Sequence, residues 1–405
     1  MNVVISGYGA ITPLGNGVEA LWSGLLAGQS GVKELDPGDP TWEKLPVRVA
    51  ATVTADLESV LGRVRARKLD RSQQLALIAT AEAWKDAGNP SVDPDRLAVV
   101  IGTGIGGINT LLEQNDILAD RSARRVSPRT VPMLMSNGAS AQISIEYGAR
   151  AGTFTTASAC ASGAEAITMG ARLIQNGDAD VVIVGGVEAP IKPITLAAFA
   201  QAQALAFPDG PVEELSRPFD KHRRGFVLGE GAGIMVLERE DHAQARGARV
   251  RAVMAGWGIS ADAYNITAVP QGGHGQIRAM RNALKLADLS STEIDHINAH
   301  ATGTAIGDRA EASALNDVFG FDVPVTAPKG ALGHLVGGAG AVEAIITALS
   351  VETGTIPATR NLKELDPEMR LNVVVDGPQH TKVKAAISNS FGFGGQNVSI
   401  ALRRP

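Results

Sequence analysis

Short apolar runs alternate with longer segments of helical periodicity along the whole chain. The runs are rich in Val and Ile and are bounded by Gly, Asp or Pro, a pattern typical of strands buried on both faces of a sheet. They lie at residues 3–6, 97–101, 181–184, 233–237, 250–255, 296–298, 372–375 and 385–388. Helices are predicted at residues 17–27, 72–87, 163–176, 276–287, 308–318 and 340–352. The alternation predicts an α/β protein with its helices outside the sheets.

The sequence also contains a short internal echo. An apolar run followed by Gly-aromatic-Gly occurs at residues 3–10 and again at residues 253–259. Chance can produce so short a match, but two similar αβ halves would account for it. We place the junction in the charged stretch at 246–249, which predicts an N-terminal half of residues 1–247 and a C-terminal half of residues 248–405.

The composition is that of a large globular protein. The chain has 405 residues, of which 44% are hydrophobic and 20% are charged, so it can bury a sizeable core and is too apolar to be disordered. Its formal net charge of -5 argues against generic binding to nucleic acid or to an anionic membrane. Gly, Pro or charge interrupts each apolar stretch, so no membrane span is predicted. Cys160 is the only cysteine, and a free thiol suits a reducing cytosol, so we expect a cytoplasmic protein.

Cys160 is the first residue suited to chemistry. It follows the small residues Ala157, Ser158 and Ala159 and precedes a predicted helix. A cysteine at a helix N-terminus lies at the positive end of the helix dipole, among unpaired N–H groups, and both favour the nucleophilic thiolate. The same pattern also fits a buried cysteine in a close helix contact, so spacing alone leaves both interpretations open.

Two histidines occur in further motifs. His300 ends a predicted strand, and Thr302 and Thr304 follow it with small residues between them, so both hydroxyls are expected to face one groove. His334 lies in a Gly-rich loop before a helix. Either histidine taken alone is as compatible with a structural role as with a catalytic one.

Charged and aromatic residues complete the candidate set. Lys329 precedes the His334 loop, and Glu343 is its expected ion-pair partner; the alternative is a solvated lysine. Phe391 and Phe393 are separated by glycine, which predicts an apolar lid whose N–H groups form part of an oxyanion hole. The alternative for this segment is a Gly-rich turn between two C-terminal strands.

Taken in this order, the motifs resemble one family, the elongating (type II) β-ketoacyl-acyl-carrier-protein synthases of the thiolase superfamily. The resemblance runs nearly end to end, from the segment at 7–15 through those at 216–220 and 225–231 to the Gly-Phe-Gly-Gly loop at 392–395. It implies a thiolase-like five-layer α-β-α-β-α fold built from two duplicated βαβαβαββ halves. It also implies a homodimer, with a heterodimer containing a chain-length factor as the alternative.

The resemblance assigns a role to each candidate residue. Cys160 matches the nucleophile, His300 and His334 the two catalytic histidines, and Lys329 the active-site lysine paired with Glu343. Phe393 matches the gating phenylalanine, and its N–H and that of Cys160 match the oxyanion hole. The substrate-binding positions are Thr302 and Thr304, which match hydroxyls that bind the phosphopantetheine arm, and Ile105, Met135, Phe199 and Phe391 around the acyl chain, with Met135 reaching across the dimer.

The implied reaction is that of a 3-oxoacyl-acyl-carrier-protein synthase, an acyltransferase. An acyl chain held as a thioester on Cys160 condenses with malonyl-acyl-carrier protein, which loses carbon dioxide, and the chain grows by two carbons. No redox or metal cofactor is expected; a structural monovalent cation near Asn298, Glu343 and Asn389 is implied by resemblance only. Because the carrier protein is acidic, a basic docking patch is expected. Its candidate residues are Arg63, Arg65, Arg67, Lys68, Arg71, Arg124, Arg125 and Arg129.

The chain departs from the family pattern at three positions. Gln203 stands where an arginine is common, Asn265 replaces a frequent histidine, and Ala301 replaces a common glycine, as also occurs in the branch that elongates mycolate precursors. These changes leave chain length, pathway and partner open.

Other functions are compatible with parts of the sequence. A polyketide ketosynthase subunit paired with a chain-length factor is the first, and a CoA-using thiolase is the second, although thiolases use a second cysteine or a Cys-His-Asn set. A non-catalytic chain-length factor would lack Cys160. A dinucleotide site at 102–107 has no acidic ribose ligand to support it.

Overall fold

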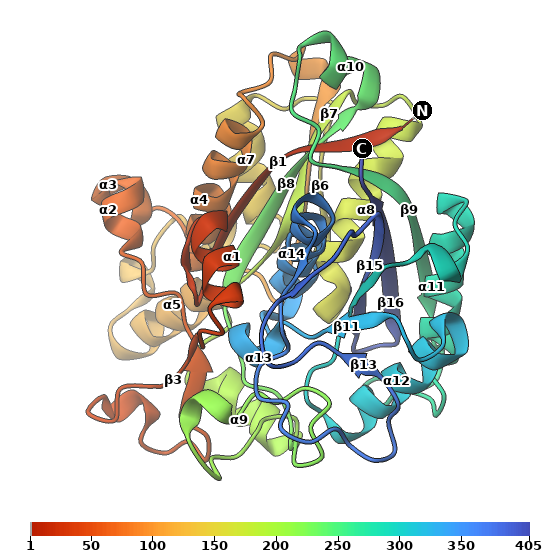
Figure 1. Ribbon diagram of the computed structural model, residues 1–405. Helices are drawn as coiled ribbons and strands as arrows, with labels where there is room; N and C mark the ends of the chain where they lie inside the picture. Colours follow the sequence, from red (N-terminus) through yellow and green to blue (C-terminus); the bar gives the residue numbers. More distant parts are fainter. Residues whose placement is uncertain (1) are drawn as a thin grey trace.

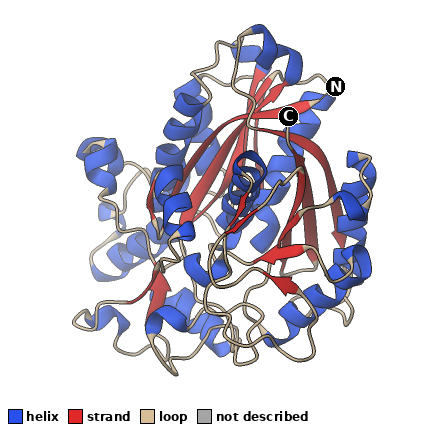
Figure 2. Cartoon of the chain, viewed as in Figure 1, coloured by secondary structure: helices blue, strands red, loops and turns tan. Residues whose placement is uncertain are grey.

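The computed structural model describes residues 2–405 and shows five layers of secondary structure (Figures 1 and 2). Helices form the two outer layers and the central one, and five-stranded blocks of β-sheet lie between them. This is the α/β, thiolase-like architecture that the sequence predicts. The two described chain ends lie near each other at the top of the molecule (Figure 1).

The two sheet blocks have the same strand order. The order is β6-β5-β7-β8-β1 in the first and β11-β10-β15-β16-β9 in the second. In each block three parallel strands are followed by two that alternate in direction. The strands are β1 (Val3–Thr12), β5 (Leu97–Gly102), β6 (Gly152–Thr156), β7 (Val181–Glu188), β8 (Gly231–Arg239), β9 (Ala252–Ala261), β10 (His296–Asn298), β11 (Pro324–Thr326), β15 (Ala385–Gly392) and β16 (Gln396–Arg403).

The blocks are joined through their last strands. Val3, Val4 and Ile5 of β1 pair antiparallel with β9, so the blocks form one continuous sheet. The sheet is extended by β2 (Gly15–Asn16) and β13 (Asn372–Val373). Two small separate sheets pair β3 (Val32–Glu34) with β4 (Val49–Ala51) and β12 (Thr355–Ile356) with β14 (Gln379–His380).

Two helices fill the central layer and position the site. They are α8 (Ser162–Gln175) and α14 (Ala339–Thr353), which pack on both blocks (Figure 1). The outer faces are covered by α4 (Arg71–Asp86) and α7 (Gly138–Tyr147) on one side and by α11 (His274–Ala287) and α12 (Ala305–Phe319) on the other. The remaining helices are α1 (Val18–Leu26), α2 (Leu57–Leu61), α3 (Arg63–Ala66), α5 (Ile108–Asp120), α6 (Thr130–Leu134), α9 (Pro193–Gln201), α10 (Glu240–Ala245) and α13 (Lys329–Leu332).

Each strand and helix predicted from the apolar pattern corresponds to an observed element, and most of the strands extend further. Four strands of the main sheet were missed: β2, β6, β11 and β16. In β6 the sequence Gly-Thr-Phe-Thr-Thr is mostly polar, because this edge strand is only partly buried. The short strand β11 begins with a proline. The helix α7 was missed because it contains small and polar residues without a clear apolar stripe.

The internal echo reflects the same strand–helix contact made twice. A Cβ atom on Gly9 would lie 1.9 Å from the carbonyl oxygen of Ala79 on α4, and one on Gly258 would lie 1.9 Å from that of Ala279 on α11. Glycine is therefore required for β1 and β9 to approach their helices. The predicted boundary at 247/248 falls between α10 and β9 and stays a prediction.

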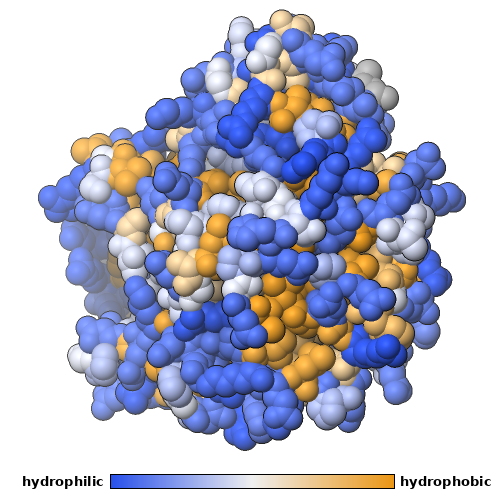
Figure 3. Space-filling view, in the orientation of Figure 1, coloured by the Kyte–Doolittle hydropathy of each residue, from blue (hydrophilic) through white to orange (hydrophobic). Residues whose placement is uncertain are grey.

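One segment has the length and mean hydropathy of a membrane span, although Gly337, Gly338, Gly340 and Glu343 interrupt it, as the sequence pattern indicates. Residues Val336–Thr353 have a mean hydropathy of 1.2 and the length to cross a bilayer, but 89% of this segment is buried inside the protein. It is the central helix α14 with the turn before it. Hydrophilic side chains cover most of the face in Figure 3, which agrees with the apolar residues lying between the layers.

Candidate active site

Cys160 lies in a tight turn that leads directly into α8. The turn is the 3₁₀ segment Ala159–Ala161, and Ala159 has a φ of 51°, in the left-handed region. Ser162 holds it: the Ser162 hydroxyl donates to the Ala159 carbonyl at 2.7 Å and accepts from the Ser158 N–H at 2.9 Å. Glycine is needed at position 392 beside this turn, because a Cβ there would be 2.5 Å from the Ser158 carbonyl oxygen.

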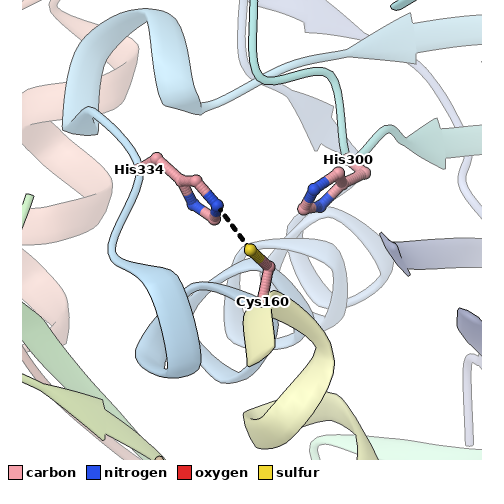
Figure 4. Close-up of side chains that lie close together, drawn as sticks. All are labelled: Cys160, His300 and His334. Carbon is pink, nitrogen blue, oxygen red and sulfur yellow. Dashed lines mark hydrogen bonds between the residues drawn. The ribbon is translucent and has the colours of Figure 1, made fainter. Parts of the chain in front are cut away.

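Both predicted histidines meet at the cysteine (Figure 4). His334 Nε2 lies 3.0 Å from Cys160 Sγ. The Cys160 Sγ atom and one imidazole nitrogen from each of His300 and His334 all lie within 4.8 Å of one another. The two imidazole rings meet edge to face with their centroids 5.5 Å apart. The three side chains come from three separate segments, so the cluster depends on the fold as a whole.

Each histidine is fixed through its backbone. The N–H groups of His300 and of Ala301 each donate to the Glu311 carboxylate at 2.7 Å, which holds the turn after β10. The His334 N–H donates to the Val227 carbonyl at 2.7 Å, and the Phe226 ring packs edge-on against the imidazole at 5.2 Å. These contacts leave both rings facing the sulfur.

Lys329 and Glu343 form a buried ion pair behind the histidines. Lys329 Nζ also lies 3.5 Å from His300 Nδ1. An ammonium can only donate, so Nδ1 of His300 accepts and its ring proton is on Nε2. His334 Nδ1 is buried without a partner. Among the described residues a proton on Nδ1 would have no acceptor, so the tautomer of His334 with its proton on Nε2, which faces Cys160 Sγ, is favoured as well.

Burial dominates the electrostatics of the cluster. It lowers the pKa of both His300 and His334 well below the ordinary value, and the Lys329 charge acts in the same direction. Both rings are thus neutral at pH 7. Burial also raises the pKa of Glu343 to about 7, against the attraction of Lys329, and the pKa of Glu311 to about 8, against its two N–H donors.

The charge state expected for Cys160 needs correction. Burial raises the pKa of the Cys160 thiol to about 11, although the Lys329 charge and the backbone N–H groups of Phe393 and Cys160 lower it. The helix terminus therefore does not by itself secure a thiolate, as the sequence interpretation assumed. One face of Cys160 remains open to a cavity, so the sulfur is enclosed and still reachable.

A cavity of about 630 Å³ opens above the sulfur. Most of the predicted site residues line it, namely Cys160, His300, His334, Phe391, Phe393, Phe199, Ile105, Thr302 and Thr304. The hydroxyls of Thr302 and Thr304 are 3.2 Å apart, as expected for two groups that face one groove. Phe393 is 40% exposed in the three-residue turn between β15 and β16, so this segment is both a Gly-rich turn and part of the cavity wall.

Three predicted residues lie elsewhere. Lys329 and Glu343 stand behind His300 and do not line the cavity, and Met135 is 45% exposed outside it. Met135 reaching across a dimer stays a prediction. Arg71 does not belong to a free basic patch, because it is paired with the buried Glu230 at 2.6 Å and donates to the Val53 carbonyl.

Sequence reasoning missed several buried charges that shape the site. Glu311 holds the His300 turn, and Asp308 accepts from the Phe219 and Gly303 N–H groups. Arg223 donates to the carbonyls of Thr304 and Ala305 and pairs with Asp366 at 2.7 Å. Asp308 and Glu311 are buried three residues apart on α12, and this spacing within the predicted helix at 308–318 was the only sequence signal for them.

Family models match most of the chain. "Beta-ketoacyl synthase, N-terminal domain" matches residues 1–243, and "Beta-ketoacyl synthase, C-terminal domain" matches residues 251–363. The "3-oxoacyl-[acyl-carrier-protein] synthase 2" of Mycobacterium tuberculosis is 43% identical over 407 residues, which is 99% of this chain and 97% of that protein. The protein of the same name from Staphylococcus aureus is 39% identical over 408 residues, with 99% and 98% coverage.

Solved structures with the same architecture include ketosynthase complexes. "The ishigamide ketosynthase/chain length factor" has a TM-score of 0.92 and 33% identity, covering 100% of this chain and 99% of that one. A β-ketoacyl synthase from Burkholderia phymatum has a TM-score of 0.92 and 31% identity with the same coverage. A type II polyketide synthase acyl-carrier protein in complex with its ketosynthase has a TM-score of 0.91 and 27% identity, also with 100% and 99% coverage.

Proposed function

Because the chain belongs to the β-ketoacyl synthase family and is therefore an acyl-transferring enzyme, we propose the course of its reaction from the residues around Cys160. The observation that carries the proposal is the meeting of Cys160 with His334 at 3.0 Å and with His300, at the floor of one cavity. A nucleophile and two neutral N–H donors directed at the same small volume suit acyl transfer followed by decarboxylation.

The first step loads the acyl chain on Cys160. The thiol loses its proton, Sγ attacks the thioester carbonyl of an acyl-carrier protein, and the carbonyl oxygen takes the negative charge. The N–H groups of Cys160 and Phe393, which lie against Sγ, are placed to donate to that oxygen. The C–S bond of the carrier then breaks, the pantetheine thiolate takes up a proton, and the chain remains on Cys160.

The second step generates the carbon nucleophile. The bond between the malonyl carboxylate and the α-carbon breaks, carbon dioxide leaves, and the electron pair moves towards the thioester oxygen. His300 and His334 each donate Nε2–H to that oxygen. The low pKa of each ring keeps it neutral, and the N–H of a neutral imidazole is so weak an acid that it donates a hydrogen bond to the enolate without giving up its proton.

The third step joins the two carbons. The α-carbon attacks the Cys160 thioester, the oxyanion again faces the Cys160 and Phe393 N–H groups, and the C–S bond breaks to release the 3-oxoacyl product. Cys160 leaves as a thiolate and takes up a proton from water. The acyl chain has then passed from Cys160 to the two-carbon unit left from malonyl, so the product chain is two carbons longer.

We also propose an acyl-carrier protein as the partner. The solved ketosynthase with a bound acyl-carrier protein supports this at 27% identity. The exposed basic residues that offer a docking face for an acidic partner are Arg63, Arg65, Arg67, Lys68, Arg124, Arg125 and Arg129. Arg65 is the least free of these, since it pairs with Glu146.

A monovalent cation near Asn298, Glu343 and Asn389 stays a proposal. Asn298 Oδ1 and Glu343 Oε2 are buried without a hydrogen-bond partner, which supports it. Asn389 Oδ1 accepts from the Ser399 hydroxyl at 2.7 Å and is less available. Cytoplasmic location and homodimerisation are likewise proposals.

A second candidate is the ketosynthase subunit of a heterodimer. It is favoured by the likeness to a ketosynthase/chain-length-factor pair at 33% identity. Native mass spectrometry of the chain expressed alone, with an assay of 3-oxoacyl-carrier-protein formation, separates the candidates. A homodimer that condenses acyl- and malonyl-carrier protein supports the first. An inactive chain that gains activity with a second subunit supports the heterodimer, and an active chain that accepts only CoA esters contradicts both.

A further inference from the structure

Glu188 is a buried carboxylate that the reaction above does not use. It is the last residue of β7 and is 0% exposed. Its Oε1 accepts from the Thr103 hydroxyl at 2.9 Å and the Ile105 N–H at 3.1 Å. Its Oε2 accepts from the Gly104 N–H at 2.7 Å and the Gly337 N–H at 3.1 Å. All four partners are donors, so both oxygens serve as acceptors.

These donors belong to two segments with different tasks. The segment 103–105 follows β5 and carries Ile105, which lines the cavity above Cys160. Gly337 lies three residues after His334, in the 3₁₀ turn Val336–Gly338 that leads into α14. One side chain therefore holds the wall of the cavity and the loop of a catalytic histidine.

The two segments touch closely around the carboxylate. A Cβ on Gly337 would lie 2.5 Å from the Gly104 nitrogen and 2.7 Å from Glu188 Oε2. A Cβ on Gly104 would lie 2.9 Å from Glu188 Oε2 and 3.2 Å from Val336 Cγ1. The segments thus meet backbone to backbone around the one carboxylate that is bonded to both.

No cationic side chain balances Glu188. Among the described residues, none of the ion pairs involves its carboxylate. A buried carboxylate without an ion pair depends entirely on its hydrogen bonds. Burial raises its pKa, and the four donors oppose that rise.

We infer that Glu188 is a positioning residue that fixes Ile105 of the acyl cavity and His334 of the catalytic pair relative to each other. The inference rests on the proposed function, because it concerns acyl-chain length and malonyl decarboxylation. Glu188→Gln keeps the shape of the side chain but turns one acceptor oxygen into an NH₂ group. Whichever way the amide is oriented, at least one backbone N–H of the loops then faces a donor: that of Ile105 in one orientation, or those of Gly104 and Gly337 in the other.

The test uses two readouts in the full chain. The first is the ratio of the rates at which Cys160 is acylated by long and by short acyl-carrier proteins. The second is carbon dioxide release from malonyl-carrier protein in a Cys160→Gln background, which depends on His300 and His334 but not on acylation. Glu188→Gln is expected to change the first ratio and to slow the second reaction roughly 10- to 100-fold, as for a small misplacement of a catalytic group.

Glu82→Gln is the matched control. Glu82 also accepts two backbone N–H bonds, from Ala10 and Val18, each at 2.8 Å, but it does so on α4, and it does not line the cavity. This variant is expected to keep the parental length ratio and decarboxylation rate. Ile105→Phe is the reference for a cavity defect, because filling that volume should penalise long chains more than short ones.

A second variant covers a folding failure of Glu188→Gln. Thr103→Val removes one donor on the Ile105 side and leaves the Gly337 bond intact, so it should alter the length ratio with little effect on decarboxylation. Folded Glu188→Gln or Thr103→Val protein that behaves like Glu82→Gln, with an equal loss at all chain lengths or none, overturns the inference. If Cys160→Gln releases no carbon dioxide in the parental background, the proposed function fails instead, so the two failures are distinct.

Discussion

The turns that follow β5 and β10 occupy matching places in two sheet blocks of the same strand order, and each is held by one buried carboxylate. Glu188 accepts the N–H groups of Gly104 and Ile105, and Glu311 accepts those of His300 and Ala301. The first turn presents an apolar side chain to the cavity, and the second presents an imidazole.

The same division continues across the molecule. The N-terminal half provides the nucleophile Cys160 and the apolar wall residues Ile105 and Phe199, whereas the C-terminal half provides both histidines, the Lys329–Glu343 pair and most of the cavity lining. The two sheet blocks thus have the same strand order but carry different parts of the catalytic site. Variants that remove one contribution while sparing the other test this separation.

Cys160→Gln should separate the two halves most completely. Without Sγ no acyl chain can be held, so condensation is expected to fall to background, while malonyl decarboxylation is retained or rises because His300 and His334 remain. Carbon dioxide release and 3-oxoacyl product are measured separately, with circular dichroism as the control for folding. Loss of both activities in a folded variant would contradict the separation.

Replacing one histidine should weaken decarboxylation, which is the contribution of the C-terminal half. His334→Ala or His300→Ala removes one N–H donor from the developing enolate, so decarboxylation should slow roughly 100- to 1,000-fold, as for an oxyanion-hole donor. Acylation of Cys160 should slow less. The check is single-turnover acylation beside carbon dioxide release; a folded His334→Ala protein that decarboxylates at the parental rate would show that the site is misplaced.

The pH dependence of Cys160 reactivity sharpens the account of the nucleophile. With a thiol pKa of about 11, the thiolate fraction is small at pH 7 and increases about tenfold per pH unit until the pKa is approached. Alkylation by iodoacetamide, followed by mass spectrometry of Cys160, should accelerate accordingly between neutral and alkaline pH. A rate that is already constant above pH 7 would show that the thiolate is present there and that burial is outweighed.

The smallest expected effect tests whether the strand–helix contact made by Gly9 is equivalent to that made by Gly258. Gly9→Ala and Gly258→Ala each place a methyl group against a helix carbonyl, so each should cost about 1–3 kcal/mol of unfolding free energy by overpacking. Gly210→Ala is the control, because no atom lies within 4 Å of its added Cβ. Urea unfolding followed by fluorescence measures all three. A cost at only one of the two positions would mean that the repeated contact is not equivalent.

The sequence predicted the reactive residues of the site better than the buried carboxylates that hold the turns carrying them. Cys160, His300, His334 and Lys329 stand in local motifs, and the structure brings them together. Glu188 and Glu311 stand in no motif, because a carboxylate that accepts N–H bonds from another segment has no fixed local pattern. Glu188 lies 84 residues from Gly104 and 149 from Gly337, and Glu311 lies 11 from His300.

The other differences have similar physical causes. The apolar pattern located strands that are buried on both faces and missed the partly exposed edge strand β6, since only buried positions leave a strong signal. The helix terminus at Cys160 was read correctly, but its effect on the pKa was overestimated, because burial depends on residues from other segments. The local sequence indicates where the helix begins, whereas the pKa of the Cys160 thiol depends on residues from distant segments that bury it.

The position of β1 in the sheet also has a consequence for biosynthesis. This strand contains the first residues that the structure describes, and it pairs with β8 and β9, which come about 220 residues later. At about 5–20 residues per second on the ribosome, the first apolar strand waits roughly 10–45 s for its partners. The nascent chain must therefore keep Val3, Val4 and Ile5 from pairing elsewhere, which makes this segment a natural client for chaperones bound near the ribosomal exit.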